Sequence, residues 1–229
     1  MSVSCYIDAA FRSSYKNEVY IFMKNEYVLL DYAPGSTNDK ILNGPLRIRE
    51  GFPSLIGTPF AESGIDCAFD TDDNEAFIFS TKRCALINYA PRTTNDKILE
   101  GPVKIKHKFP FLENTVFARG IDAAFKSSIS KEAYLFKGDT YALINYDSNK
   151  LIHVQKITDG FHGLRGTVFA SGIDAAFASH RSDHQAYIFK GDLYALIDFA
   201  PHTTDDFMIG GKLKPILPNW PSLRRILPR

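Results

Sequence analysis

The chain of 229 residues carries 27 Lys and Arg against 26 Asp and Glu, a formal net charge of +1. Proteins bind nucleic acids and anionic membranes through concentrated positive charge, and this balance excludes such a charge excess. We therefore expect neither a nucleic acid nor a membrane as partner. Hydrophobic residues make up 45% of the chain and aromatic residues 13%, which is enough for a folded core.

The first residues show no basic segment followed by an apolar core, so we expect no signal peptide. The three cysteines are an odd number without metal-ligand spacing, and no Asn-x-Ser/Thr glycosylation motif occurs. Both features fit a reducing compartment. The sequence predicts a cytosolic protein.

A five-residue stretch occurs four times. Its copies are Ile7-Asp8-Ala9-Ala10-Phe11, Ile65-Asp66-Cys67-Ala68-Phe69, Ile121-Asp122-Ala123-Ala124-Phe125 and Ile173-Asp174-Ala175-Ala176-Phe177. From Asp to Asp the copies lie 58, 56 and 52 residues apart, and 55 residues follow the last Asp. A period of this length is typical of architectures whose units bury their faces against one another. We expect one domain over residues 1–229, with repeats near residues 4–60, 61–117, 118–169 and 170–229.

Each repeat continues with the same order of elements. An aromatic-rich run such as Val19-Tyr20-Ile21-Phe22 precedes a tight turn and a second apolar run such as residues 27–32, and both runs favour strands. The turns at residues 137–139 and 190–192 are glycine-centred, and we expect Asn25 to take the positive-φ position of the first repeat. A Pro- and Asx-containing turn and then an outer strand or short helix complete the unit. The third repeat lacks the Ala-Pro turn and has His162 where the others have proline.

Three or four antiparallel strands per repeat, apolar on both faces, suit blades stacked around an axis. The prediction is an all-β fold, a four-bladed β-propeller with a central ion-binding channel. A solenoid is the alternative, but it needs polar capping repeats, and neither end of the chain resembles a cap. We expect the ring to close.

The five-residue stretch is expected to form the innermost strand, because its Ala-Ala pairs suit the crowded axis. The free edge of that strand then presents N–H and C=O groups that need water or ions as partners. Alternate residues of a strand point the same way, so the Asp and the second Ala are expected to share a direction. We expect four carbonyls to hold Ca²⁺ or Na⁺ and four N–H groups to hold chloride. The cation residues are Asp8, Asp66, Asp122 and Asp174, and the anion residues are Ala10, Ala68, Ala124 and Ala176.

The Asp side chains have two alternative roles. They either hydrogen-bond a neighbouring blade and fix the register of the ring, or they support the cation electrostatically.

These motifs resemble hemopexin-type repeats over the full chain. The resemblance rests on the fourfold Ile-Asp-Ala-Ala-Phe stretch, the Tyr-x-Phe-Lys-Gly-Asp block and the Phe-Pro-x-Leu ending. The Ala-Leu-Ile-Asn-Tyr-Ala-Pro block and the compact length are most similar to the legume seed albumin-2 family. That resemblance implies a propeller with calcium and chloride in its channel, binding of the polyamine spermine and of haem, and a homodimer. It also implies an abundant seed albumin that serves as a nutrient reserve and is linked to polyamine metabolism.

Ring closure departs from the hemopexin pattern. Secreted hemopexin domains usually join the first and fourth units by a disulfide, whereas here Cys5 lies near the first strand and the last unit has no cysteine. Closure is expected to rest on packing between the terminal blades, so the ring is expected to open more readily than in disulfide-locked relatives. Such opening would allow exchange of subunits or dissociation of the dimer on ligand binding.

No catalytic motif is recognised, since the chain has no Gly-x-Ser-x-Gly elbow, phosphate-binding glycine loop or His-Glu-x-x-His helix. We expect no enzyme and no catalytic residue. Cys67 and Cys84 take repeat positions held elsewhere by Ala and Tyr, and we expect them to be packing residues.

The sequence leaves the haem ligand and the polyamine contacts unassigned. Six histidines lie outside the repeated pattern and are either surface residues or haem ligands. They are His107, His153, His162, His180, His184 and His202. A polyamine needs spaced carboxylates and carbonyls, which the channel and its mouths would supply. The expected mouth residues, which are otherwise solvated turn residues, are Glu18, Asp70, Asp72, Asp73 and Glu75.

The sequence leaves three alternative functions for the protein. The leading one is a non-enzymatic seed albumin that binds ions, a polyamine and haem. The second is a nutrient-reserve protein whose ions are purely structural. The third is a protein-interaction scaffold, which a large exposed apolar patch on one face would favour.

Overall fold

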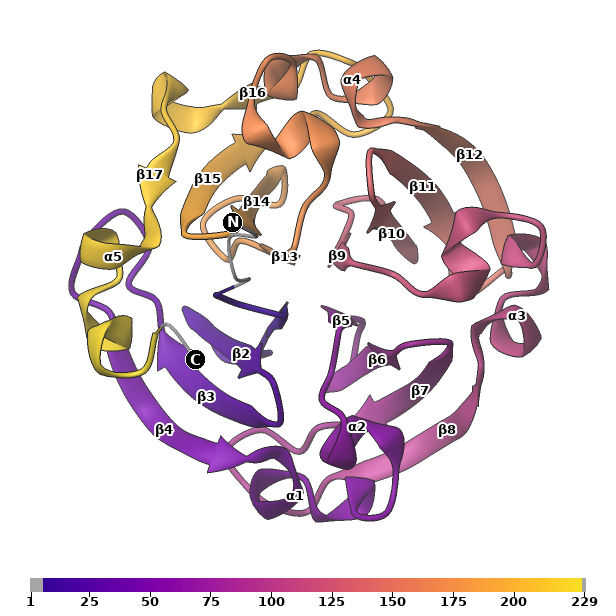
Figure 1. The fold of residues 1–229 in the computed structure, drawn as a ribbon, viewed down its shortest axis with the longest axis vertical. Coiled ribbons are helices and arrows are strands. Elements are labelled where there is room, and N and C mark those ends of the chain that lie inside the picture. The colour runs from indigo at the N-terminus through magenta and orange to yellow at the C-terminus, as the bar shows by residue number, and fades with distance from the viewer. Residues whose placement is uncertain (1–5, 228–229) are drawn as a thin grey trace.

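Four antiparallel sheets surround a common axis in the computed structural model, which describes residues 6–227 (Figure 1). We call the sheets blades 1 to 4 in chain order. Blade 1 contains β1 (Ala9–Arg12), β2 (Glu18–Met23), β3 (Glu26–Asp31) and β4 (Lys40–Arg47). Blade 2 contains β5 (Cys67–Asp70), β6 (Glu75–Ser80), β7 (Arg83–Asn88) and β8 (Lys97–Lys104). Blade 3 contains β9 (Ala123–Lys126), β10 (Glu132–Lys137), β11 (Thr140–Asn145) and β12 (Lys150–Lys156). Blade 4 contains β13 (Ala175–Ala178), β14 (Gln185–Lys190), β15 (Leu193–Asp198), β16 (Phe207–Met208) and β17 (Lys214–Pro215).

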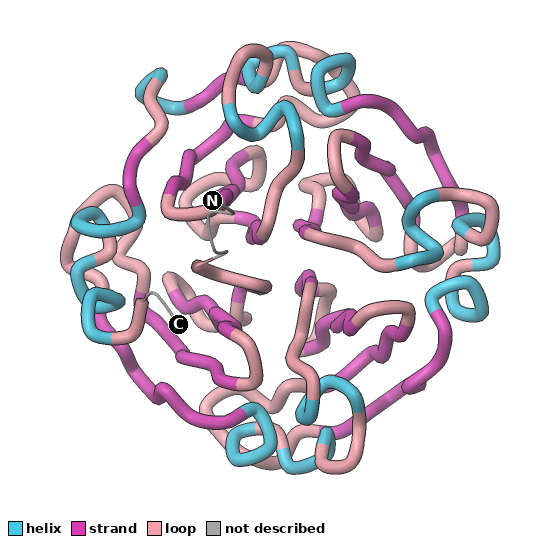
Figure 2. Tube along the Cα trace, viewed as in Figure 1, coloured by secondary structure: helices cyan, strands magenta, loops and turns pink. Residues whose placement is uncertain are grey.

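Short helical segments follow the outer strands and connect the blades, most of them toward the rim (Figure 2). The α-helical segments are α1 (Ile48–Gly51), α2 (Pro59–Glu62), α3 (Ile105–Lys108), α4 (Ile157–Gly160) and α5 (Ile216–Asn219). The 3₁₀ segments are η1 (Pro53–Leu55), η2 (Pro110–Leu112), η3 (Val116–Arg119), η4 (His162–Leu164), η5 (Val168–Ser171), η6 (Ile209–Gly211) and η7 (Pro221–Arg225). Proline opens several of them, because its fixed φ suits the first helical position. Over residues 6–227, no helix has the length and apolar character needed to cross a membrane.

The inner strands close the ring. β1 packs beside both β5 and β13, and β9 packs beside the same two strands. A solenoid would leave its first and last units apart, so this contact between blades 1 and 4 excludes it. The expected all-β chain of four antiparallel sheets is confirmed. Cys5, considered above for closure, lies outside the described residues.

The hydrophobic core lies between the blades, in four clusters that each join two neighbours. Between blades 1 and 2, Phe11, Phe22 and Phe52 meet Ile78 and Tyr89. The same plan recurs at the other three boundaries, and Trp220 takes the place of Phe52 where blade 4 meets blade 1. Because both faces of every blade are covered only by its neighbours, no blade could bury its apolar surface alone.

The hairpin turns between the second and third strands place their positive φ on the first of two turn residues. That residue is Lys24 (φ 55°), Thr81 (51°), Gly138 (53°) or Gly191 (56°) in the four blades. The expectation that Asn25 takes this position was wrong, because β2 extends to Met23 and the turn therefore begins at Lys24. Glycine meets the requirement without steric cost, whereas Lys24 and Thr81 need support from their surroundings.

Blade 4 differs from the others in its outer edge. Its outer strand is split into β16 and β17 by η6, where Gly210 and Gly211 adopt φ values of 76° and 61°. In blades 1 to 3 the outer strand is continuous.

Candidate functional site

One aspartate from each blade lines a single cavity on the axis of the ring. The cavity has a volume of about 200 Å³, and its lining residues are Asp8, Asp66, Asp122 and Asp174. We call it the axial cavity. Each aspartate occupies a bend immediately before its inner strand. The ring thus brings together the four aspartates that the sequence singled out.

Each aspartate side chain binds the hairpin of its own blade. One carboxylate oxygen accepts the backbone N–H of the positive-φ turn residue, at 2.5 Å from Thr81, 2.8 Å from Gly138 and 2.7 Å from Gly191, with Lys24 donating to Asp8 in the same way. Of the two alternative roles, these bonds do not support the one in which the side chains bond a neighbouring blade. The side chains support the turns of their own blades and still line the cavity, so the carboxylates are fixed in place before any ligand arrives.

The backbone N–H of each aspartate also points into its own blade. It donates to the carbonyl of Phe22, Phe79, Phe136 or Phe189, at 2.8–3.0 Å. We expected the backbone groups of the aspartate and of the second alanine to point toward the axis together. For the N–H of the aspartate this expectation was wrong. The alternation rule holds within a strand, whereas the aspartate lies in a bend outside it.

The second alanine of each stretch presents its backbone to the free edge of the inner strand. In blade 1 the N–H of Ser13 donates to the carbonyl of Glu18, and hydrogen-bonded pairs alternate along the ladder from there. Ala10, opposite Ile21, therefore belongs to a pair without mutual hydrogen bonds, so its N–H points away from β2. In the other blades, hydrogen-bonded and non-hydrogen-bonded pairs alternate in the same order. The N–H groups of Ala68, Ala124 and Ala176 therefore also point away from the second strand of their blades.

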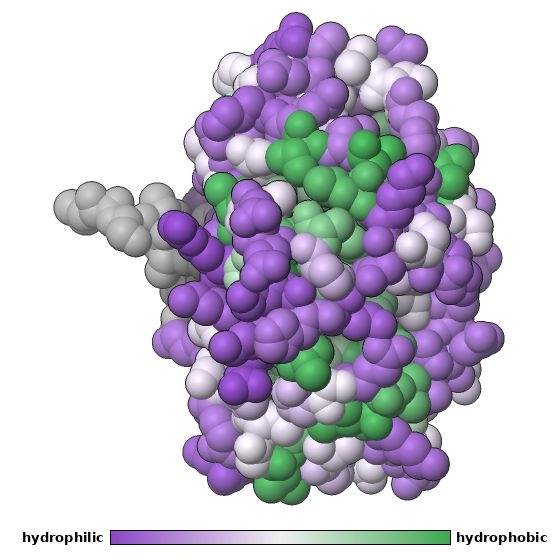
Figure 3. Space-filling view, turned by 90° about the vertical axis from the view of Figure 1, so that its right-hand side faces the viewer, coloured by the Kyte–Doolittle hydropathy of each residue, from purple (hydrophilic) through white to green (hydrophobic). Residues whose placement is uncertain are grey.

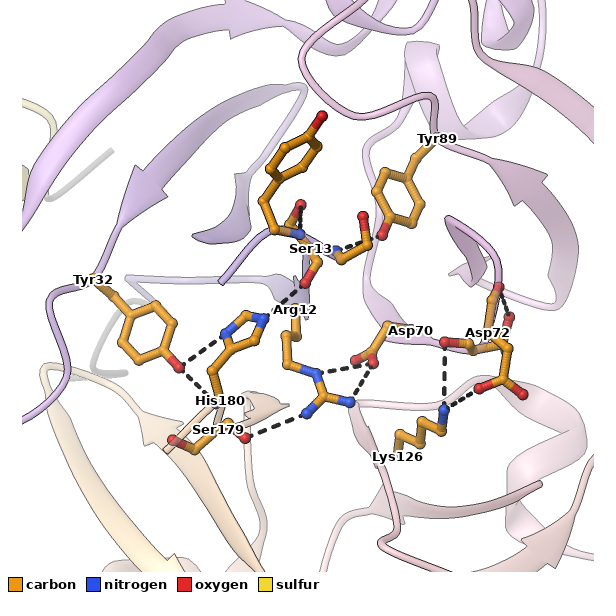
Figure 4. Close-up of polar contacts among 12 residues, drawn as sticks. Arg12, Ser13, Tyr32, Asp70, Asp72, Tyr89, Lys126, Ser179 and His180 are labelled. Atoms are coloured by element: carbon orange, nitrogen blue, oxygen red, sulfur yellow. Dashed lines mark hydrogen bonds and ion pairs between the residues drawn. The ribbon is translucent and has the colours of Figure 1, made fainter. Parts of the chain in front are cut away.

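Charged residues of a different kind occupy the opposite end of the inner strands (Figure 4). Arg12 lies 3.0 Å from the carboxylate of Asp70 and donates to the carbonyl of Ser179 at 3.3 Å. Lys126 lies 2.5 Å from the carboxylate of Asp72. The two ends of the axis therefore differ in make-up. Four aspartates lie at one end, where Lys137 pairs with Asp122, and the Arg12–Asp70 and Lys126–Asp72 ion pairs lie at the other.

Of the five acidic residues expected at the channel mouths, three are already in ion pairs. Asp70 pairs with Arg12, Glu18 pairs with Arg92, and Asp72 pairs with two lysines. Hydrogen bonds from Lys126 and Lys131 lower the pKa of Asp72 to about 2.

The acidic turn of blade 2 does not reach the axial cavity. Asp72, Asp73 and Glu75 line a separate cavity of about 230 Å³ between blades 2 and 3. The structure thus brings together the four aspartates that precede the inner strands, but the acidic turn lies apart from them.

The six histidines have different surroundings. His180 bridges two blades, since its Nε2–H donates to the carbonyl of Ser13 at 2.9 Å and its Nδ1 lies 3.1 Å from the Tyr32 hydroxyl. His184 lies in the same connection between β13 and β14 as His180, but its ring faces the ring of Phe199. His107 and His162 are exposed on the rim helices α3 and η4.

His153 and His202 line one cavity of about 470 Å³ between blades 3 and 4, which we call the histidine cavity. His153 Nε2 lies 3.0 Å from the Tyr141 hydroxyl, and His202 Nε2 lies 2.7 Å from Glu132. The sequence did not pair these two residues, because they belong to different repeats. Their separate departures from the repeated pattern were the available signal.

Both described cysteines are buried in the cluster between blades 2 and 3. Burial raises the pKa of Cys84 to about 12 and raises the pKa of Cys67 well above its usual value. A thiol held in its neutral form is a poor nucleophile. Both residues act in packing, as expected. Over residues 6–227, no three His, Cys, Asp or Glu side chains are grouped so that they could hold a metal ion.

Comparison with known proteins reveals full-length relatives, although no protein-family model matches the chain. Albumin-2 of Pisum sativum is 54% identical over 230 residues, which cover 100% of this chain and 99% of the relative. A hemopexin fold protein from cow pea superposes with a TM-score of 0.95 at 53% identity, over 99% of this chain and 100% of that one. A structure described as a plant lectin with two metal binding sites from Cicer arietinum has a TM-score of 0.95 at 55% identity, over 98% and 99% of the two chains. The chain therefore belongs to the albumin-2 family.

Proposed function

We propose that this seed albumin is a non-enzymatic binding protein that holds a cation, Ca²⁺ or Na⁺, in the axial cavity. The observation that carries the proposal is the convergence of Asp8, Asp66, Asp122 and Asp174 on one space of about 200 Å³. The aspartate N–H groups are directed into their own blades, so the backbone carbonyls would serve as the cation ligands. The carboxylates, held by the hairpin amides, would add negative charge beside the ion. The metal sites of the Cicer arietinum relative support a cation in this fold.

An anion, chloride, would lie deeper along the axis. The N–H groups of Ala10, Ala68, Ala124 and Ala176 point from the free edges of the inner strands, and converging N–H groups favour an anion. Arg12 and Lys126 at the far end of the strands are each paired with an aspartate, so the N–H groups themselves would hold the anion. The order of ions would thus follow from the aspartates at one end and the free alanine N–H groups further along the axis.

A polyamine such as spermine would enter from the aspartate end. Its ammonium groups require carboxylates and carbonyls, which that end supplies, whereas Asp70 and Asp72 at the other end are already paired with Arg12 and Lys126. Spermine and the metal ion would then compete for the same cavity.

Calorimetry on metal-free protein tests this proposal, with Ca²⁺ and spermine titrated separately and in competition. The variant Asp66→Asn with Asp174→Asn keeps an oxygen for each hairpin N–H and removes two charges. It should weaken both ligands at least about tenfold, which is about 1.4 kcal/mol. The pair Asp192→Asn with Asp205→Asn removes two exposed carboxylates that lie outside the cavity lining and should change neither affinity. Equal affinities in both variants, or no binding heat, would count against the axial site.

The histidine cavity is a second candidate site, for haem. It offers two imidazoles, each with one ring nitrogen free of hydrogen bonds to any residue in 6–227, between the aromatic walls of Tyr134, Phe161 and Phe199. The surface that lines the cavity is more polar than apolar, so the imidazoles, rather than an apolar wall, would hold the group, and bound haem would supply an iron centre.

A hemin titration followed by absorbance tests the histidine cavity. His153→Ala and His202→Ala should weaken binding and shift the Soret band, whereas His107→Ala on the rim should do neither. Spermine calorimetry after saturation with hemin then shows whether the two sites are coupled. Absence of both ligands from their sites would favour a nutrient-reserve protein.

The structure does not favour the interaction scaffold. Nine large hydrophobic side chains are exposed over residues 6–227. Leu42, Leu99, Val154 and Phe207 lie one on each outer strand, around the rim, and the other five lie in the connections between strands: Tyr15, Ile56, Val116, Ile129 and Val168. Figure 3 shows hydrophobic residues of the rim interspersed with hydrophilic ones. An apolar docking face would instead gather them on one side of the ring.

A further inference from the structure

A cavity of about 320 Å³ lies where blade 4 meets blade 1, under the split outer strand. β15 pairs with β17 at Leu193 and Tyr194 and with β16 at Ile197 and Asp198, which leaves Leu196 without an outer partner. In the other blades the residues equivalent to Leu196, which are Leu29, Leu86 and Leu143, all pair with the outer strand. The glycine break at η6 therefore opens the edge of blade 4, and Leu196 lines the cavity beneath it.

Three aromatic side chains form the wall of this cavity. Tyr187 and Tyr194 meet Trp220 edge to face, each with ring centroids 5.7 Å apart. All three are nearly buried, with Trp220 only 3% exposed. Such a wall favours a flat ring as ligand, since aromatic pairs prefer edge-to-face or offset contacts.

Three cations surround the cavity: Arg181, Lys212 and Lys214. None of them forms an ion pair with any residue in 6–227. The nearby carboxylate of Asp39 is held by the N–H and hydroxyl of Ser222. Arg181 lies over the blade 1 turn, where a Cβ on Gly35 would meet its guanidinium at 3.0 Å.

The other blade boundaries neutralise their cations internally. Glu18, at the start of β2, pairs with Arg92, and Glu132, at the start of β10, pairs with His202. Between blades 2 and 3, Asp72 pairs with Lys131. The residue at the start of β14 is the neutral Gln185, so the boundary between blades 4 and 1 lacks the carboxylate that its equivalents have. An anionic ligand would supply the missing negative charge.

We propose that this cavity binds a small aromatic anion, with one or two rings against Tyr187, Tyr194 and Trp220 and an acidic group between Arg181, Lys212 and Lys214. The site is separate from the axial cavity and from the histidine cavity. Its volume suits a compact ring system better than a macrocycle. Three unpaired cations exclude polyamines from it.

The chain contains one tryptophan, Trp220, so its fluorescence reports on this cavity alone. The probe is 4-nitrobenzoate, whose nitroaromatic ring quenches indole on contact, and 4-nitrobenzyl alcohol is its neutral counterpart. We expect saturable quenching by the anion, weakened by salt, and at least about tenfold weaker binding of the alcohol, a difference of about 1.4 kcal/mol.

The variant Lys212→Gln with Lys214→Gln should weaken 4-nitrobenzoate binding about tenfold or more, while the alcohol is unaffected. The matched control, Lys97→Gln with Lys104→Gln, removes two exposed lysines from the outer strand of blade 2 and should leave binding unchanged. Unchanged thermal unfolding of both variants shows that they fold. Quenching that does not saturate, equal binding of acid and alcohol, or equal effects of the two lysine pairs would overturn the proposal.

Discussion

The boundary between blades 4 and 1 and the boundary between blades 2 and 3 have the same apolar plan but different polar contacts. Phe177, Phe189 and Trp220 build the first core, and Phe69, Phe79 and Phe109 hold the equivalent positions in the second. The chain runs directly from blade 2 into blade 3, whereas blades 4 and 1 contain its two ends (Figure 1). The two boundaries therefore have equivalent aromatic cores, but only the boundary between blades 2 and 3 is also crossed by the chain.

The boundary without the connection has directional hydrogen bonds of its own. Asp39 accepts the N–H of Ser222 at 3.0 Å and also its hydroxyl. His180 receives the Tyr32 hydroxyl and donates to the carbonyl of Ser13 (Figure 4). Closure thus rests on hydrogen bonds as well as on the packing that the sequence led us to expect.

The boundary between blades 2 and 3 relies on weaker polar contacts. Asp72 pairs with Lys126 and Lys131, and its side chain is 44% exposed. Exposed ion pairs contribute little to stability. The third repeat lacks the Ala-Pro turn that carries Asp39 in blade 1, so this boundary has no equivalent of the Asp39–Ser222 contact.

The largest expected effect compares Trp220→Ala with Phe109→Ala. Each removes a buried aromatic ring and should lower the free energy of unfolding by about 3–5 kcal/mol. Only Trp220→Ala should also let the ring open, because no chain segment joins blades 4 and 1. Urea unfolding measures the loss of stability. Opening of the ring is measured by amide hydrogen exchange, which should become faster in β1 and β13, the inner strands of blades 1 and 4, than in β5 and β9, those of blades 2 and 3. Equal exchange patterns in the two variants would contradict the comparison.

A smaller effect is expected from the buried aspartates that link neighbouring blades. Asp96 accepts the N–H of Ser54 at 3.2 Å between blades 1 and 2, as Asp39 does from Ser222 between blades 4 and 1. Loss of either carboxylate leaves the N–H of a half-buried serine without its partner and should cost about 1 kcal/mol. Asp39→Ala should cost more than Asp96→Ala, because no chain connection limits the opening of its boundary. Chemical denaturation measures the free energy of unfolding of both variants. A loss in Asp39→Ala that is equal to or smaller than the loss in Asp96→Ala would contradict this prediction.

The fourfold stretch predicted the sheets, the inner strands and the closed ring, because these depend on period and on small residues, both of which can be read from the sequence. It also predicted that four aspartates converge. The bend at each aspartate could not be read from the sequence, and that bend turns the N–H and the carboxylate into the same blade.

Contacts between repeats were the part that the sequence did not predict. His153 and His202 come together because the outer strand of one blade faces the turn of the next. Such pairs depend on the angle between blades rather than on any spacing along the chain. The signal that could have found them is comparison of equivalent positions, as with Glu18, Glu132 and Gln185 at the starts of their strands.

The smallest expected effect is a pH dependence carried by His180 at the boundary between blades 4 and 1. Burial lowers the pKa of His180, and the nearby Arg12 lowers it further, while the hydrogen bond to Ser13 acts in the opposite direction. In the unfolded chain the imidazole takes up its proton near pH 6.5. The unfolded state therefore binds the proton first on acidification, so the stability from neutral His180 is complete above about pH 6.5 and is lost as the pH falls through the lower folded value.

His180→Gln separates this titration from the hydrogen bonds. A glutamine can donate to Ser13 and accept from Tyr32, but it does not titrate, so stability at pH 8 should change little while the loss between pH 7 and 5 becomes smaller. Denaturation curves across this range measure the slope, with His107→Gln on the rim as the control that removes an exposed imidazole. If both variants lose stability on acidification as steeply as the unmodified protein, His180 does not link closure of the ring to pH.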